Sequence, residues 1–180
     1  VTCRNGYRYV LCFICVATGK AWHYNMRNKN EALDGFKEFE KYLGTIRPFV
    51  EKKHNKPMKL SVISFDREGS LTTTYGAMRS LADEYFHKQG YARIFTSAGD
   101  SSISYRIERF WRTMKECVRA SILESGLKDA FFFDAVQVFV YHYNCLPTDS
   151  NRIEPNVPPN ESLGLKFNVH RLRQFGLLGV

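Results

Sequence analysis

The segment from Ser104 to Leu127 constrains the fold most, because its apolar residues recur at the three- and four-residue steps of an α-helix. This stripe consists of Ile107, Phe110, Trp111, Met114, Cys117, Val118, Ile122 and Leu123. It predicts a helix with one buried face. A second face carries Glu108, Arg112, Lys115 and Arg119. The simplest interpretation of that face is a solvated surface with a Glu108–Arg112 ion pair.

A second carboxylate of interest, Asp66, ends the apolar run 60–65, which predicts a short buried strand. A carboxylate at a strand end and another on a later helix can converge on a divalent cation. Magnesium is held in this way by a few carboxylates together with substrate phosphates, and such sites drive phosphoryl transfer. Two acids alone do not define such a site.

The remaining elements follow from the same patterns. We expect strands at 7–16, 21–26 and 91–96, with a weaker third strand of the opening meander at 25–29. We expect helices from residue 31 with a kink or break near 44–48, at 75–89, and at 128–143. Strands that alternate with helices indicate the α/β class. The last helix is apolar almost all round, which favours burial in the core or, in addition, an oligomer contact.

The chain length of 180 residues fits one domain with a sizeable core. We expect residues 1–146 to form this core. Four prolines among polar residues at 147–166 predict a linker or an arm on the surface. Residues 167–180 are apolar again and are expected to dock back onto the core.

Net charge and cysteine content indicate which partners the chain can contact and in which redox compartment it folds. The net charge of +8 permits contact with polyanions, and residues 1–60 hold twelve Lys and Arg against five Asp and Glu. Five cysteines without a secreted spacing indicate reduced thiols in the cytosol or nucleus. Cys12 and Cys15 point to opposite faces of a strand, which disfavours zinc. No run of 18 apolar residues exists, so we expect no membrane contact.

Several motifs, taken in order, are similar to one family. These are YRYVLCFICVATGKAW (7–22), VISFDREGS (62–70), IERFWRTM (107–114), SGLKDAFFFDAV (125–136), YHYNCLPT (141–148) and LRQFG (172–176). Together they resemble the catalytic core of copia-type long-terminal-repeat retrotransposon integrases, including those of budding-yeast Ty elements. The resemblance implies an RNase H-like fold, a mixed five-stranded sheet flanked by helices. It also implies three carboxylates that hold two metal ions, with Asp66 as the second acid and Glu108 as the third.

The chain departs from the family pattern at the proposed catalytic positions. Cys15 stands where the resemblance places the first acid, and no Asp or Glu occurs between Val1 and Asn30. The Gln-Asn-Gly stretch of the family before the third acid is replaced by residues 103–105 (Ile, Ser, Tyr). A neutral thiol is a poor ligand for magnesium, which prefers oxygen. We therefore expect no resident cofactor, with Mg²⁺ or Mn²⁺ at Asp66 and Glu108 only if the site still functions.

Three functions stay open at this point. The first is a catalytically inactive, domesticated module for protein interaction or assembly in a nuclear DNA-associated complex, with a homodimer through the aromatic helix 128–143 as one option. The second is a DNA-binding domain that does not cleave and that contacts DNA through Arg112, Lys115 and Arg119. The third is a metal-dependent polynucleotidyl transferase that carries out DNA strand transfer.

Overall fold

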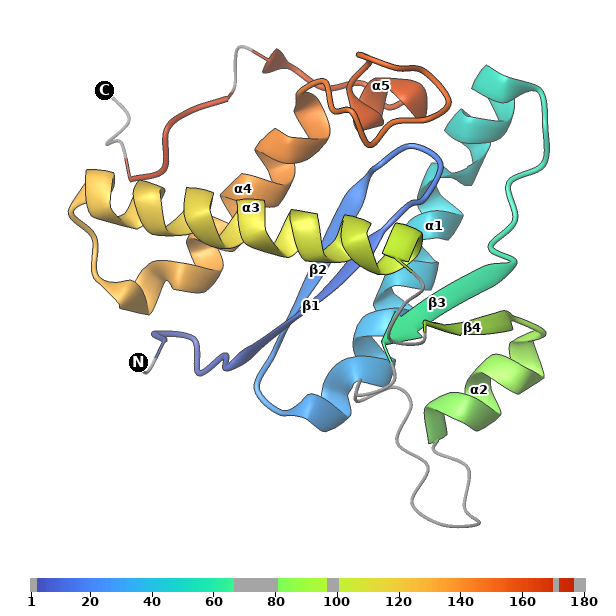
Figure 1. The fold of residues 1–180 in the computed structure, drawn as a ribbon, viewed down its shortest axis with the longest axis horizontal. Helices are drawn as coiled ribbons and strands as arrows, with labels where there is room; N and C mark the ends of the chain where they lie inside the picture. Colours follow the sequence, from blue (N-terminus) through green and yellow to red (C-terminus); the bar gives the residue numbers. More distant parts are fainter. Residues whose placement is uncertain (1–2, 67–80, 97–100, 170–171, 177–180) are drawn as a thin grey trace.

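The computed structural model describes residues 3–66, 81–96, 101–169 and 172–176, and at residues 65, 66, 95, 96 and 101–104 it describes the backbone alone. Within these ranges the chain is a mixed α/β protein with helices on both sides of its strands (Figure 1). None of the described helices combines the length and hydropathy that crossing a bilayer requires.

The strands are β1 (Tyr9–Ile14), β2 (Ala21–Met26), β3 (Val62–Asp66) and β4 (Ala92–Thr96). The helices are α1 (Ala32–His54), α2 (Leu81–Gln89), α3 (Ser101–Ser125), α4 (Phe132–Cys145) and α5 (Pro159–Ser162), with short 3-10 helices η1 (Lys29–Glu31) and η2 (Asp129–Phe131). The strands predicted at 7–16, 21–26, 60–66 and 91–96 are confirmed to within a few residues. The predicted start of the helix at 75–89 lies outside the described residues, and α3 begins at Ser101, three residues before the predicted start at Ser104.

The strands form two pairs. β1 and β2 make an antiparallel hairpin in which Phe13 lies opposite Trp22. β3 and β4 are parallel, with Val62 opposite Ala92. Among the described residues these pairs are separate two-stranded sheets, so the single five-stranded sheet that the resemblance implies is not present there.

The third strand expected at 25–29 does not form, because polar side chains start a helix there instead. β2 ends at Met26. The Glu31 carboxylate then accepts the backbone N–H of Asn28 at 3.0 Å and that of Arg27 at 3.1 Å. This capping box satisfies N–H groups that a strand would have offered to a neighbour.

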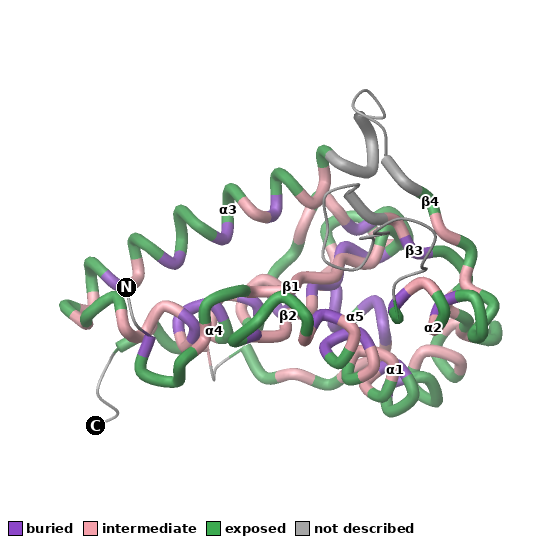
Figure 2. The backbone as a smooth tube through the Cα atoms, turned by 90° about the horizontal axis from the view of Figure 1, so that it is seen from below, coloured by how far each residue is buried: buried purple, intermediate pink, exposed green. Residues whose placement is uncertain are grey.

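The hairpin divides the core into two layers because strand side chains alternate between faces. On one face, Leu11 and Phe13 pack around Phe36 of α1. On the other face, three side chains of β1 pack against α3 and α4: Val10, Cys12 and Ile14. In the view of Figure 2, α3 runs along one side of the molecule with its exposed residues outward.

The observed helices differ from the predicted ones in two details. The fully buried residues of α3 form one i+4 row, Phe110, Met114, Val118 and Ile122, and the predicted Ile107 and Trp111 pack half-buried beside it. Two other residues of the predicted stripe, Cys117 and Leu123, are exposed, Leu123 to 82%. α1 continues through Pro48 to His54, so the break that was one of the two predicted alternatives does not occur. Pro48 and Gly44 are both exposed, so the carbonyl that loses its helical hydrogen bond faces water, which can replace it.

The proline-containing arm, residues 147–166, folds around one buried side chain. The Asn151 amide donates to Val157 O at 2.9 Å and to Ser162 Oγ at 2.6 Å. Its Oδ1 accepts the backbone N–H groups of Ile153 and Glu154. Because Asn151 is only 2% exposed, this hub holds the arm in one conformation.

The arm is also tied to the core. The backbone N–H of Arg152 donates to Ala17 O at 2.8 Å, next to the hairpin turn. Lys53 of α1 bonds the Glu154 carboxylate and Glu161 O, each at 2.8 Å. Farther along the chain, Phe175 packs against the core between α3 and α4.

Candidate functional site

Cys15, which occupies the expected place of the first acid, directly follows β1. Its backbone N–H donates to Lys20 O at 2.8 Å, and its carbonyl accepts the N–H of Gly19 at 2.9 Å. Gly19 has a φ of +73° in this turn, a conformation that favours glycine. The half-buried thiol of Cys15 is therefore held at the end of a strand by a closed turn.

Arg106 of α3 reaches the same strand end. Its Nη1 donates to Val16 O at 2.8 Å and lies 3.5 Å from Ser150 O. Partial burial lowers the pKa of the Arg106 guanidinium, and the nearby Arg152 lowers it further, whereas Cys15 acts in the opposite direction. Within the described residues, neither arginine forms an ion pair with a carboxylate.

Glu108, the candidate third acid, lies two residues after Arg106 on α3. Residues of an α-helix are ~100° apart around the axis, so Glu108 points about 200° away from Arg106. Glu108 is exposed to solvent. The structure therefore brings Arg106, and not Glu108, to the strand end beside Cys15.

Asp66, the candidate second acid, is the last residue of β3, and its backbone lies opposite Thr96 of β4. Its side chain is outside the described ones, so the convergence of Asp66 and Glu108 on a metal ion stays a prediction. Among the side chains that are described, no group of three or more His, Cys, Asp or Glu is arranged to hold a metal.

The cations of α3 form an exposed row made of Arg112, Lys115 and Arg119. At 1.5 Å per residue they are spaced ~4.5 Å and ~6 Å along the helix axis. In the described part of the chain none of them forms an ion pair, and the expected Glu108–Arg112 pair does not form. Their charges are therefore available to an anionic partner.

Lys20 is a buried cation that the sequence does not single out. It is only 4% exposed, and its Nζ donates to Asn160 Oδ1 of α5. The ammonium lies 5.4 Å from the ring centroid of Trp22 and 5.8 Å from that of Tyr42. Burial lowers the pKa of Lys20 to about 8, against the opposing effect of Cys145. Lys20 thereby joins the hairpin, α1 and α5.

Asn144 of α4 binds the outer edge of β2 as a neighbouring strand would. Its Nδ2 donates to Ala21 O at 2.8 Å, and its Oδ1 accepts the N–H of Ala21 at 2.9 Å. Ala21 is 1% exposed and Asn144 is 6% exposed, so water cannot replace either bond. The side-chain amide matches a peptide group because it carries one donor and one acceptor side by side.

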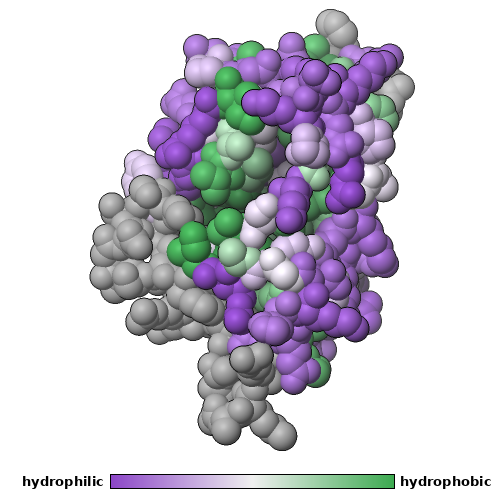
Figure 3. Space-filling view, turned by 90° about the vertical axis from the view of Figure 1, so that its right-hand side faces the viewer, coloured by the Kyte–Doolittle hydropathy of each residue, from purple (hydrophilic) through white to green (hydrophobic). Residues whose placement is uncertain are grey.

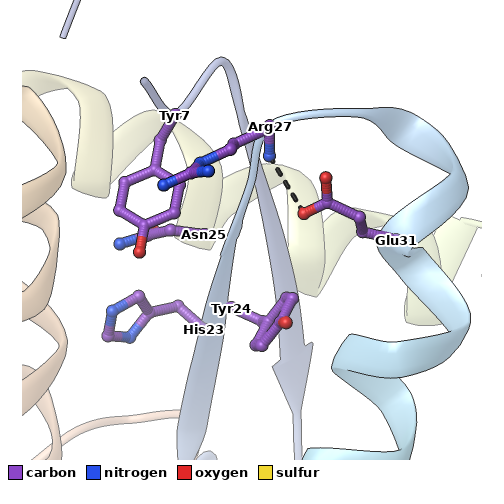
Figure 4. Close-up of a pocket in the computed structure, with 6 residues that line it drawn as sticks. All are labelled: Tyr7, His23, Tyr24, Asn25, Arg27 and Glu31. Carbon is purple, nitrogen blue, oxygen red and sulfur yellow. Dashed lines mark hydrogen bonds between the residues drawn. The ribbon is translucent and has the colours of Figure 1, made fainter. Parts of the chain in front are cut away.

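A pocket of about 510 Å³ lies beside β2 (Figure 4). It is lined by Tyr7, His23, Tyr24, Asn25, Arg27 and Glu31. Burial lowers the pKa of His23, and Asn25 Oδ1 is buried without a hydrogen-bond partner among the described groups. The Arg27 guanidinium lies 6.0 Å from the Tyr7 ring centroid. The pocket is open and polar and contains no predicted site residue.

Three side-chain contacts around the hairpin were missed from the sequence: those of Arg106, Lys20 and Asn144. Arg106 adjoins Ile107 of the apolar stripe, and Lys20 follows the turn residue Gly19, but neither pattern specifies the partner. Asn144 falls within the YHYNCLPT motif, but the sequence does not indicate that its side-chain amide bonds to Ala21.

No protein-family model matches the chain, and no curated protein matches it either.

Proposed function

We propose that this chain is an RNase H-like, integrase-type core that does not join DNA and that serves as a protein-interaction or assembly module in a nuclear DNA-associated complex. The order of its elements supports this proposal: a hairpin, a long helix, a parallel pair with a helix between its strands, and two long helices. The helices on both sides of the strands also agree with an RNase H-like arrangement. A single sheet of five strands is part of the proposal.

The observation that supports the loss of catalysis is the Arg106 guanidinium, which donates to Val16 O next to Cys15, with Arg152 close enough to Arg106 to lower its pKa. A two-metal site needs negative oxygen ligands at this strand end. Here the thiol of Cys15 supplies no carboxylate, and Arg106 and Arg152 add positive charge that repels a divalent cation. The two effects act together, and each ~1.4 kcal/mol lost in the transition state lowers the rate about tenfold.

The test is a strand-transfer assay with labelled recessed-end DNA and a supercoiled acceptor, in Mg²⁺ and separately in Mn²⁺. The native chain is expected to give no joined product with either metal. Cys15→Asp alone is expected to stay inactive because Arg106 remains, and the double variant with Arg106→Ala tests that explanation. Metal-dependent joining by the native chain refutes the proposal.

DNA binding without cleavage is the second candidate, and the exposed row on α3 favours it. Arg112, Lys115 and Arg119 have the spacing and the solvent access that phosphate contacts require. Each phosphate contact contributes about −0.9 to the slope of log affinity against log salt on duplex DNA. Replacing all three residues with alanine is expected to reduce the magnitude of the slope by about 3.

The salt-dependence assay has a charge-matched control. Alanine at three exposed cations elsewhere, Lys52, Lys56 and Lys88, removes the same charge. Fluorescence anisotropy between ~50 and 200 mM salt should separate the two triple variants. An equal loss of affinity in both would show a net-charge effect and would exclude α3 as the contact surface.

The expected homodimer contact through the aromatic helix has little free surface on α4. Phe133, Val136 and Val140 are buried in the core of the chain itself, and Tyr141 is the exposed aromatic residue at 43%. A homodimer contact through α4 therefore depends on Tyr141 and on the half-buried aromatic residues of that helix, and it stays a prediction.

A further inference from the structure

A pocket of about 340 Å³, the α1 pocket, lies where α1 meets the segments that lead into β3 and β4. Glu40, Leu43 and Arg47 line it from one face of α1, because they are three and seven residues apart. Lys59 and Leu60, which precede β3, also line it. Figure 3 faces the right-hand side of Figure 1, where these segments lie, and shows apolar side chains gathered in a hollow between hydrophilic rims.

Tyr91, which precedes β4, is a fixed wall of the α1 pocket. Its hydroxyl donates to Glu40 Oε1, and the Tyr85 hydroxyl donates to Glu40 Oε2. The centroid of the Tyr91 ring lies 5.9 Å from that of Phe36, a fully buried residue of α1. Because this wall is already held in place, a ligand does not have to order it, which favours binding.

The floor of the pocket is apolar and rests on the core. Leu43 is 8% exposed and packs with Ile46 and Leu163. Leu60 packs against this cluster and also against the cluster around Phe36. The volume lies at the low end of the ~300–1,000 Å³ of small-molecule sites, so the pocket suits one or two peptide side chains better than a large cofactor.

Two cations lie at the rim of the pocket, Arg47 and Lys59. Both are exposed, and in the described part of the chain neither forms an ion pair. Burial and the bond to Glu40 raise the pKa of Tyr91, whereas Arg47 acts in the opposite direction from close by. Glu40 is ~10.5 Å from Arg47 along the α1 axis, since seven residues separate them. The Arg47 end is therefore the end that attracts carboxylates.

We infer that the α1 pocket binds a short segment of a partner protein that carries an apolar anchor beside one or two carboxylates. The anchor contacts Leu43 and Leu60, and the carboxylates contact Arg47 and Lys59. A nucleic acid fits this lining less well, because its phosphates offer nothing to the apolar floor.

The inference deepens the proposed interaction role and rests on it for the class of partner. Peptide binding needs neither DNA nor metal, so it is measured apart from strand transfer. Joined DNA product would refute the loss of catalysis and leave this pocket untouched. Absence of peptide binding would remove this pocket and leave the loss of catalysis untouched.

NMR of the full chain tests the inference at the pocket itself. The probe is a hexapeptide of two aspartates, a phenylalanine, a leucine, a glycine and a serine, made in this order and in the reverse order. At least one order is expected to shift the methyl signals of Leu43 and Leu60 and the side-chain amide signal of Gln89, which also lines the pocket. The shifts should saturate with a dissociation constant below about 1 mM. The methyl signals of Val136 and Val140, in the core beside α3, should not move.

Controls separate the anchor from the charge. A peptide with serine in place of phenylalanine and leucine keeps both carboxylates and should give no saturable shift. The double variant Arg47→Ala, Lys59→Ala should bind the native probe about 3- to 20-fold more weakly, as expected for two exposed ion pairs. Arg8→Ala, Lys128→Ala removes the same charge at exposed positions outside the pocket lining and should bind like the native chain.

Four results would overturn the inference. The first is no shift at about 5 mM of either peptide. The second is equal binding of the serine peptide, or equal weakening by the control variant, which would show attraction by charge alone. The third is displacement of the peptide by a DNA oligomer that depends on Arg47 and Lys59, which would make the pocket a phosphate site. The fourth is a shift that grows with protein concentration alone, which would assign the pocket to a second copy of this chain.

Discussion

Replacing Asn144 with alanine should cost more stability than the loss of any other single polar contact described above. The amide makes two hydrogen bonds to Ala21, at 2.8 and 2.9 Å, and Ala21 is 1% exposed. Truncation leaves the N–H and the C=O of Ala21 buried without partners, at about 1–3 kcal/mol each. The expected loss is therefore about 3–5 kcal/mol of unfolding free energy, a large share of the 5–15 kcal/mol typical of a domain.

Urea unfolding followed by circular dichroism measures this loss. With a denaturant slope of ~1–3 kcal/mol per molar, the unfolding midpoint should fall by about 2 M. Asn144→Asp keeps the acceptor for the Ala21 N–H but offers no donor to Ala21 O, so it should also destabilise the chain. Gln137→Ala, an exposed position on the same helix, is the control and should change stability by less than about 0.5 kcal/mol. A loss below about 1 kcal/mol for Asn144→Ala would refute the view that the amide substitutes for a strand.

Two further variants test the hairpin turn. Lys20 has a folded pKa of about 8 against an ordinary value of 10.5, so above pH ~8 the unfolded chain holds more protons and the native chain should gain up to about 3 kcal/mol of stability as pH rises to ~10.5. Lys20→Met should remove this gain, as pH-dependent urea midpoints would show; parallel curves for the two proteins would contradict the assignment. Gly19→Ala should destabilise by at least about 2 kcal/mol, because a Cβ there would lie 2.8 Å from Ser150 Cβ at a φ of +73°. Gly126→Ala, with a φ of +67° and no atom within 4 Å of the added Cβ, is the control for the left-handed backbone conformation alone. It should lower the free energy of unfolding by about half as much as Gly19→Ala.

Local patterning was enough to locate most elements. The alternation in β1 and β2 and the apolar run before Asp66 depend on neighbours in the sequence, and these strands appear where predicted. The predicted apolar stripe of α3 was too wide, because residues such as Leu123 have the right spacing but are not covered by another element. The spacing of apolar residues predicts which side of a helix can be buried, but it does not show whether another element covers that side.

The candidate site was predictable only in part, because its contacts join distant segments. The sequence placed Cys15 at the end of a strand and Glu108 on a helix. It did not indicate that Arg106, two residues before Glu108, is the side chain that turns toward the strand end. Likewise, Asn25–Lys29 was a plausible strand by position, but the Asn28–Glu31 capping box outweighs a weak strand propensity.

The tie between the hairpin turn and the arm has a consequence for biosynthesis. Lys20 emerges from the ribosome 140 residues before its acceptor Asn160. Until then the Lys20 ammonium has no Asn160 to bond, so the hairpin cannot bury it at the native cost. The native form of the hairpin must therefore wait until residue 160 has been translated, and a nascent chain stalled before that residue should expose the hairpin to chaperones and proteases.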